Sequence, residues 1–124
     1  MPLRLAGRFV GCRLIFSDAS QKRHGGLAAV LFDDPESAPL VVTRRVALAG
    51  SNELELQAAL FGLEQAHRHF PGQPVALFSD NQDAVVRLGR AKVQGLAQDP
   101  ALARMLSDLE ITNVLDQTSV CWVQ

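Results

Sequence analysis

Three carboxylates in this sequence, Asp18, Glu55 and Asp80, stand where a folded chain could bring them together. Two apolar segments end in the same way: Leu14–Asp18 reads Leu-Ile-Phe-Ser-Asp and Ala76–Asp80 reads Ala-Leu-Phe-Ser-Asp. If these segments are parallel neighbouring strands, both aspartates emerge at the carboxyl edge of a sheet, where open α/β sheets bind ligands. Glu55 borders the apolar stripe near the start of a segment with helical periodicity, so we expect it to face the rim of that sheet.

Carboxylates that converge on one point repel each other, and this repulsion raises their pKa values unless a cation is present. A hard divalent cation prefers oxygen ligands and tolerates anionic crowding. We therefore expect Asp18, Glu55 and Asp80 to hold Mg²⁺, or Mn²⁺ in its place. Taken singly, an aspartate after a strand is more often a turn or cap residue, and a glutamate near a helix start is usually a cap. The prediction depends on all three occurring in this order.

The elements that must position these carboxylates follow from apolar runs and periodicity. A polar, basic loop is expected at 21–26, and Asn52 with Glu55 fits a helix capping box. The order β-β-β-α-β-α-α-β predicts an α/β fold with a mixed five-stranded sheet and helices mainly on one face. The expected strands are 12–18, 27–32, 40–48, 75–78 and 119–123, and the expected helices run from about 52 to 70, 82 to 92 and 100 to 109.

Composition indicates an ordinary globular protein, because 48% of the 124 residues are apolar and 20% are charged. We expect one domain spanning 1–124 and, in the absence of a signal peptide or a bilayer-spanning apolar run, a cytoplasmic location without membrane contact. Cys12 and Cys121 are expected as reduced core thiols, and Trp122 as a core residue. The formal net charge of −1 means that any nucleic-acid partner would be held by local basic patches.

Four short stretches resemble the motifs of the ribonuclease H family. They are Asp-Ala-Ser at 18–20, Ser-Asn-Glu-Leu-Glu-Leu-Gln-Ala-Ala at 51–59, Ser-Asp-Asn-Gln at 79–82 and Cys-Trp-Val at 121–123. The resemblance implies a ribonuclease H-like sheet and hydrolysis of the RNA strand of an RNA–DNA hybrid. It also implies two Mg²⁺ ions, with Asp18 bridging them and Glu55 and Asp80 completing the ligand set.

The resemblance also implies residues that contact the substrate. Asn52 falls where the family has an asparagine that touches the nucleic acid, and Ser20 and Gln82 would lie near the substrate backbone. Basic side chains beside the two aspartates are expected to contact phosphates. The candidate nucleic-acid-binding residues are therefore Ser20, Asn52, Gln82, Lys22, Arg23 and Arg87.

Members of the family continue past the Trp-Val strand into a loop with a histidine and a last helix that carries a fourth carboxylate, whereas this sequence ends at Gln124. We therefore expect weak cleavage that favours Mn²⁺, and a homodimer or other partner that covers the sheet face left open by that helix. Two alternatives remain. One is a catalytically impaired ribonuclease H-like module that binds nucleic acid or protein. The other is a flavodoxin-like or receiver-like domain with one Mg²⁺, which three antiparallel opening strands disfavour.

Overall fold

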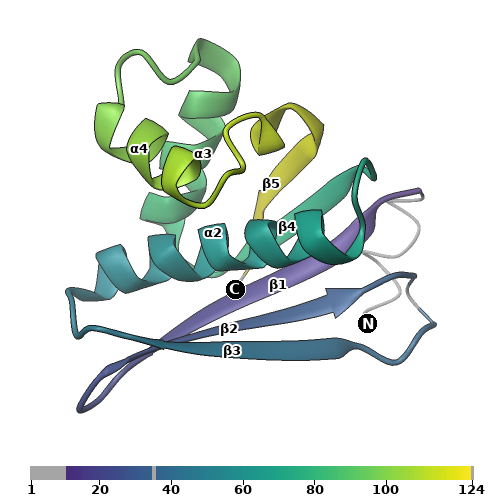
Figure 1. Ribbon diagram of the computed structural model, residues 1–124, viewed down its shortest axis with the longest axis horizontal. Coiled ribbons are helices and arrows are strands. Elements are labelled where there is room, and N and C mark those ends of the chain that lie inside the picture. Colours follow the sequence, from purple (N-terminus) through teal and green to yellow (C-terminus); the bar gives the residue numbers. More distant parts are fainter. Residues whose placement is uncertain (1–10, 35, 124) are drawn as a thin grey trace.

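The computed structural model describes residues 11–34 and 36–123. The expected order of strands and helices is confirmed, with a short 3₁₀ helix added before the last strand (Figure 1). No helix in these two ranges has the length and hydropathy needed to cross a membrane. The elements are β1 (Arg13–Gln21), β2 (Gly25–Phe32), β3 (Leu40–Val46), α2 (Ser51–His69), β4 (Val75–Ser79), α3 (Gln82–Gln94), α4 (Pro100–Asp108), η2 (Val114–Gln117) and β5 (Thr118–Trp122).

The five strands form one mixed sheet in the order β3-β2-β1-β4-β5. The β1–β2 and β2–β3 pairs are antiparallel, while β1–β4 and β4–β5 are parallel, as the sequence predicts. In the β1–β4 pair, Phe16 lies opposite Phe78. Asp18 and Asp80 each lie two residues beyond this last pair, so the pairing of β1 with β4 directs two of the three carboxylates to one edge of the sheet.

Helix α2 lies along one face of the sheet, across β1 and β2 (Figure 1). Its backbone comes close to the strands at Gly62, where an added Cβ would lie 2.9 Å from Ile15 Cγ2 and 3.6 Å from Leu77 Cδ1. Ile15 and Leu77 are fully buried. A residue without a side chain at this point therefore sets how near the helix, and with it Glu55, sits to the central strands.

The opposite face carries a second apolar cluster built on Leu14, Phe78 and Ala76. The Phe16 ring stacks on Phe78 with centroids 4.8 Å apart. Leu14 and Phe78 are each only 1% exposed, whereas Val41 on the edge strand β3 is 59% exposed. The expected open face is thus exposed mainly at its edge, and a second copy or partner on it remains a prediction. Cys12 and Cys121 are half-buried at this cluster.

The hairpin between β1 and β2 is tighter than the sequence indicates. The polar segment expected as a loop continues both strands, because Ser20 pairs with Gly26 and Gln21 with Gly25. Only residues 22–24 form the turn, which Lys22 N–H closes by donating to the His24 carbonyl oxygen at 3.2 Å. Polar residues and glycines suggested a loop, but Gln21, whose side chain is exposed, and the two glycines still pair through their backbones across the hairpin.

The capping prediction for α2 is wrong. The helix begins at Ser51 after Gly50, and no side chain caps it. Asn52 lies inside the first turn, and its amide bonds to the start of α3 instead. Helix η2 was not predicted, because four residues with only Leu115 buried leave no periodic signal.

Two helix glycines give a matched test of this packing. Gly62→Ala is expected to lower the free energy of unfolding by about 1 kcal/mol, since the clash with the branched Ile15 outweighs the gain in helix propensity. Gly89→Ala on α3, where an added Cβ meets nothing within 4 Å, should raise that free energy by about 0.5–1 kcal/mol. Urea denaturation measures both, and equal stabilisation by the two variants would contradict the close approach of α2.

Candidate metal centre

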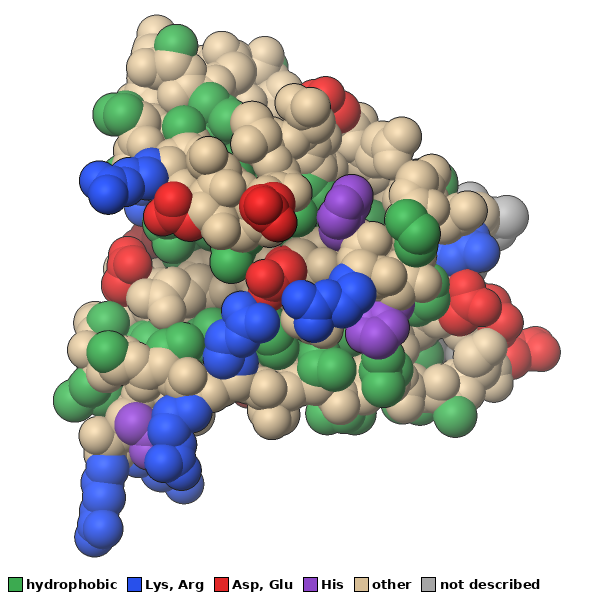
Figure 2. All heavy atoms as spheres, viewed as in Figure 1, with side chains coloured by type: hydrophobic (Ala, Val, Ile, Leu, Met, Phe, Trp, Pro, Cys, Tyr) green, Lys and Arg blue, Asp and Glu red, His purple; other side chains and the backbone are tan. Residues whose placement is uncertain are grey.

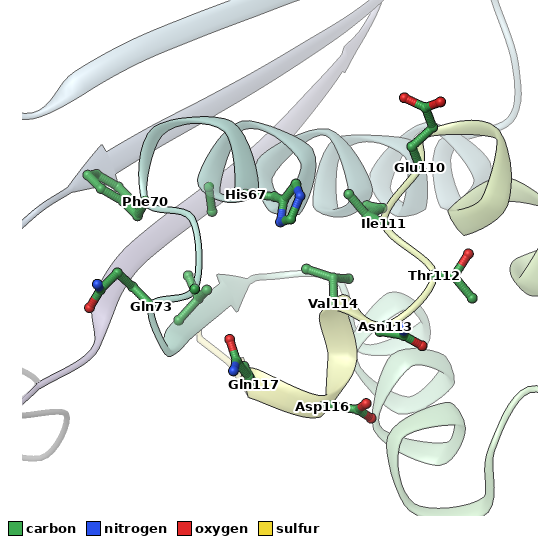
Figure 3. A pocket seen from close by; sticks show the side chains of 13 residues that line it. His67, Phe70, Gln73, Glu110, Ile111, Thr112, Asn113, Val114, Asp116 and Gln117 are labelled. Carbon is green, nitrogen blue, oxygen red and sulfur yellow. The ribbon is translucent and has the colours of Figure 1, made fainter.

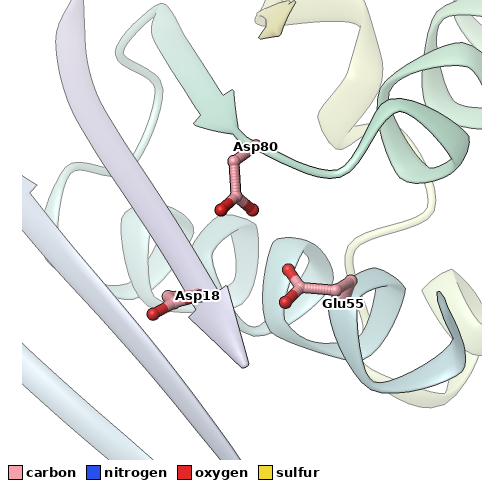
Figure 4. A group of neighbouring side chains, drawn as sticks. All are labelled: Asp18, Glu55 and Asp80. Carbon is pink, nitrogen blue, oxygen red and sulfur yellow. The ribbon is translucent and has the colours of Figure 1, made fainter. Parts of the chain in front are cut away.

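Three carboxylates from three elements meet at the carboxyl edge of β1 and β4. Asp18 lies in β1, Glu55 in α2 and Asp80 directly after β4. One ligand oxygen from each lies within 4.8 Å of the other two. Figure 4 shows the side chains around one space, with Glu55 and Asp80 both directed into it. The structure therefore brings together the three residues that the sequence singled out.

Hydrogen bonds from the end of β5 hold the backbone of Asp80 in place. The Trp122 indole N–H donates to the Asp80 carbonyl oxygen at 3.1 Å, and the Val123 N–H donates to the Ser79 carbonyl oxygen at 3.0 Å. Trp122 was predicted as a core residue, but it is 43% exposed. Its role here is to fix the backbone of a carboxylate residue, which an apolar-pattern analysis does not detect because it depends on the indole N–H.

Of the three carboxylates, Glu55 is the one whose negative charge is most strongly disfavoured by its surroundings in the absence of a cation. Burial, followed by the negative charges of Asp80 and Asp18, raises its pKa from 4.5 to about 7, although the Ala19 backbone N–H acts in the opposite direction. Its Oε2 atom is buried and has no hydrogen-bond partner among the described residues. A buried carboxylate oxygen without a donor, next to two more carboxylates, fits a divalent cation that takes oxygen ligands.

An amide relay joins the starts of α2 and α3 beside the carboxylates. Asn81 accepts from the Ala84 N–H at 2.8 Å and so caps α3, and its Nδ2 donates to Asn52 Oδ1 at 3.0 Å. Asn52 Nδ2 donates in turn to Asp83 Oδ2 at 2.6 Å. Sequence reasoning missed Asn81 and Asp83, although an asparagine directly before a helical segment is a cap signal that could have identified Asn81.

The predicted substrate-contacting residues on the strands and helices surround the cluster. Ser20 is exposed on β1, two residues from Asp18, and both residues line one surface cavity. Gln82 is exposed at the first position of α3. Asn52 is also exposed, but its side-chain amide already makes hydrogen bonds with Asn81 and Asp83. Ser20 and Gln82 are therefore the two whose side chains make no hydrogen bond among the described residues.

The predicted basic residues fall into two groups. Lys22 and Arg23 are exposed in the hairpin turn. The Arg87 guanidinium instead donates to both carboxylate oxygens of Asp99, at 2.7 and 2.9 Å. This ion pair raises the pKa of Arg87 and lowers that of Asp99. Arg87 thus links α3 to the cap of α4, and binding a phosphate there would compete with Asp99.

A cavity of about 510 Å³ lies at the opposite end of β4 from the carboxylates (Figure 3). Its lining includes Val75, the first residue of β4, and His67 near the end of α2. Because Asp80 follows the last residue of that strand, this cavity is separate from the metal centre.

Comparison with known proteins gives no match to a protein-family profile and no match to a curated protein sequence. Solved structures do match over nearly the whole chain. The first is the RNase H1 of the halophilic archaeon Halobacterium salinarum, with a TM-score of 0.64 and 19% identity over 91% of this chain and 86% of that one.

Two further structures agree with the first. The N-terminal RNase H domain of a Mycobacterium tuberculosis protein, solved as a fusion with maltose-binding protein, has a TM-score of 0.69 and 17% identity, covering 90% of this chain and 86% of that one. LC11-RNase H1, solved in complex with an RNA/DNA hybrid, has a TM-score of 0.64 and 14% identity, covering 90% of this chain and 84% of that one. At these identities the likeness establishes the architecture: the chain has the ribonuclease H-like fold.

Proposed function

We propose that this protein is a metal-dependent endonuclease that hydrolyses the RNA strand of RNA–DNA hybrids. The observation that carries the proposal is the meeting of Asp18, Glu55 and Asp80 within 4.8 Å at the carboxyl edge of the sheet. The fold supports it, since one structure with the same fold holds an RNA/DNA hybrid. The substrate class comes from that likeness and from the sequence motifs, and the chemistry comes from the carboxylates.

The carboxylates would hold Mg²⁺, or Mn²⁺ in its place. A divalent ion bound here would supply an activated water and charge stabilisation for phosphodiester hydrolysis. Glu55 must lose its proton to act as a ligand, and its buried Oε2 offers an oxygen that no described donor occupies. Trp122 keeps the backbone of Asp80 fixed, so that this ligand does not have to be ordered when the ion arrives.

Neighbouring residues would hold the substrate. The exposed Ser20 hydroxyl can donate to a phosphate oxygen or a 2′-hydroxyl, and 2′-hydroxyl contacts let a protein distinguish RNA from DNA. Lys22 and Arg23 supply positive charge at the nearby turn, which would position the backbone without reading its sequence.

A second candidate is a ribonuclease H-like module with impaired catalysis that binds nucleic acid or protein. The observation that favours it is that the cluster in the described residues has three carboxylates, whereas the family resemblance implies four. The first candidate predicts both binding and hydrolysis of the hybrid, whereas the second predicts binding of nucleic acid or protein without efficient hydrolysis. Cleavage that is weak and favours Mn²⁺ is expected if three carboxylates suffice.

Cleavage of a labelled RNA–DNA hybrid separates the two candidates. The wild-type protein should cut the RNA strand in Mg²⁺ or Mn²⁺, and Asp80→Asn should slow cutting by roughly 100-fold because it removes a metal ligand. Asp108→Asn, a matched change at an exposed residue at the end of α4, should cut at the wild-type rate. Equal rates of RNA-strand cleavage by the wild-type protein and Asp80→Asn would contradict the nuclease proposal.

The raised pKa of Glu55 predicts how stability depends on pH. Because the folded state binds this proton more tightly than the unfolded state, the free energy of unfolding should fall as pH rises from about 4.5 to about 7, and then level off. Glu55→Gln should lack this component of the decrease. Urea denaturation across this range measures it, and a difference between wild type and Glu55→Gln that is constant with pH would disprove the shift.

Metal binding should show directly as stabilisation. At pH 7.5, Mn²⁺ at a hundred times its dissociation constant should raise the free energy of unfolding by about 2.7 kcal/mol. Asp18→Asn should show little of this gain, and Asp116→Asn, an exposed residue in η2, should show all of it. Thermal denaturation with and without the ion checks this, and an equal gain in both variants would place the ion elsewhere.

A further inference from the structure

Strand register puts two rows of side chains on the sheet face opposite α2. Asp18 pairs with Ala28, and Ala28 with Thr43, so these three form one row across β1, β2 and β3. Successive side chains of a strand alternate between the two faces, so the row two residues further along β1 lies on the same face. This second row consists of Ser20, Gly26 and Arg45.

Small residues in the middle strand leave space between the outer ones. A cavity of about 350 Å³ runs from Asp18 and Ser20 on β1 to Thr43 and Arg45 on the edge strand. At Gly26 an added Cβ would lie only 2.4 Å from Ser20 Oγ, so glycine keeps this space open. We call this cavity the open-face groove; Asp18, Ser20, Gly26, Ala28, Thr43 and Arg45 are the lining residues that matter here.

Two adjacent arginines on β3 have different surroundings. Arg44 turns to the α2 side, where its Nη1 donates to Glu64 Oε1 at 2.8 Å and its guanidinium lies 4.7 Å from the centre of the Phe61 ring. Arg45 is exposed on the groove side, and no carboxylate among the described residues pairs with it. Arg44 thus stabilises the packing of the sheet against α2, while the charge of Arg45 is not neutralised by any carboxylate among the described residues.

Basic side chains lie at the end of the groove away from the metal centre, and the side chains between the two ends are neutral. His24 also lines it, and Figure 2 shows Lys, Arg and His side chains gathered at the hairpin end of the sheet, where the turn contains Lys22 and Arg23. Asp18 is the one carboxylate in the described lining, and it belongs to the metal cluster. An anion in the groove would therefore be attracted at one end and repelled at the other until a cation neutralises Asp18.

We propose that the open-face groove binds the phosphodiester backbone of the nucleic-acid strand that extends from the metal centre, with Arg45 as the main phosphate ligand and Thr43 and Ser20 as hydroxyl donors. A polyanion suits this groove because small and hydroxyl side chains line its middle and its far end has a guanidinium, Arg45, that no carboxylate among the described residues pairs with. The proposal rests on the proposed function and extends it: the substrate would cross β2 to the edge strand, and its binding would require a divalent ion.

Binding of a fluorescent RNA–DNA hybrid tests the groove separately from catalysis. Affinity is measured in Ca²⁺ at several salt concentrations, with a gel to verify that the RNA strand stays intact. Arg45→Ala should weaken binding roughly tenfold and reduce the salt slope by about one. Thr43→Glu should weaken binding far more than the matched Thr43→Gln, because it adds a negative charge to the groove. Arg68→Ala, at an exposed position near the far end of α2, should bind like wild type.

The outcomes distinguish the groove from the nuclease proposal. Binding that depends on Arg45 and on charge at Thr43 supports the groove even if the hybrid is never cut. Wild-type binding that changes less than twofold in Arg45→Ala and is equal in Thr43→Glu and Thr43→Gln overturns the groove, whether or not the hybrid is cut. Absence of wild-type binding at low salt overturns it as well. The Thr43 pair keeps the test valid if Arg45→Ala fails to fold.

Discussion

The parallel pairing of β1 with β4 is the constraint on which the rest of the site depends. It aligns Phe16 with Phe78, and two residues further along it places two aspartates side by side at the sheet edge. Each aspartate lies only two residues beyond the last paired residues, and hydrogen bonds from Trp122 and Val123 hold the backbone at Asp80 and Ser79. The close approach of α2 at Gly62 then adds Glu55 to the pair.

This arrangement concentrates negative charge where part of it cannot be solvated. Glu55 has a raised pKa because of burial first and neighbouring carboxylates second, and one of its oxygens has no donor among the described residues. Such a group destabilises the folded chain at neutral pH unless something binds to it. A site that costs stability when empty is typical of function, since packing alone would have favoured an uncharged side chain.

Apolar patterning and repeated strand endings were sufficient to predict the sheet and its mixed topology. Together with the helical periodicity around Glu55, they also predicted that the three carboxylates lie close together. The buried strands gave clear signals, and the matched endings at Asp18 and Asp80 reflect the register that the structure shows. Features that depend on single hydrogen bonds could not be predicted this way. The Asn52 relay, the Trp122 anchor and the Arg87–Asp99 pair each depend on which polar group lies opposite in space, and sequence spacing carries no such information.

The central claim is that the three carboxylates form one metal site. A crystal structure of the protein soaked in Mn²⁺, with anomalous data collected at the manganese edge, tests it most directly. The account predicts an anomalous peak bounded by Asp18, Glu55 and Asp80, with Glu55 Oε2 as a ligand. A Mn²⁺-saturated crystal with no peak there, or with Glu55 left outside the coordination sphere, would contradict it.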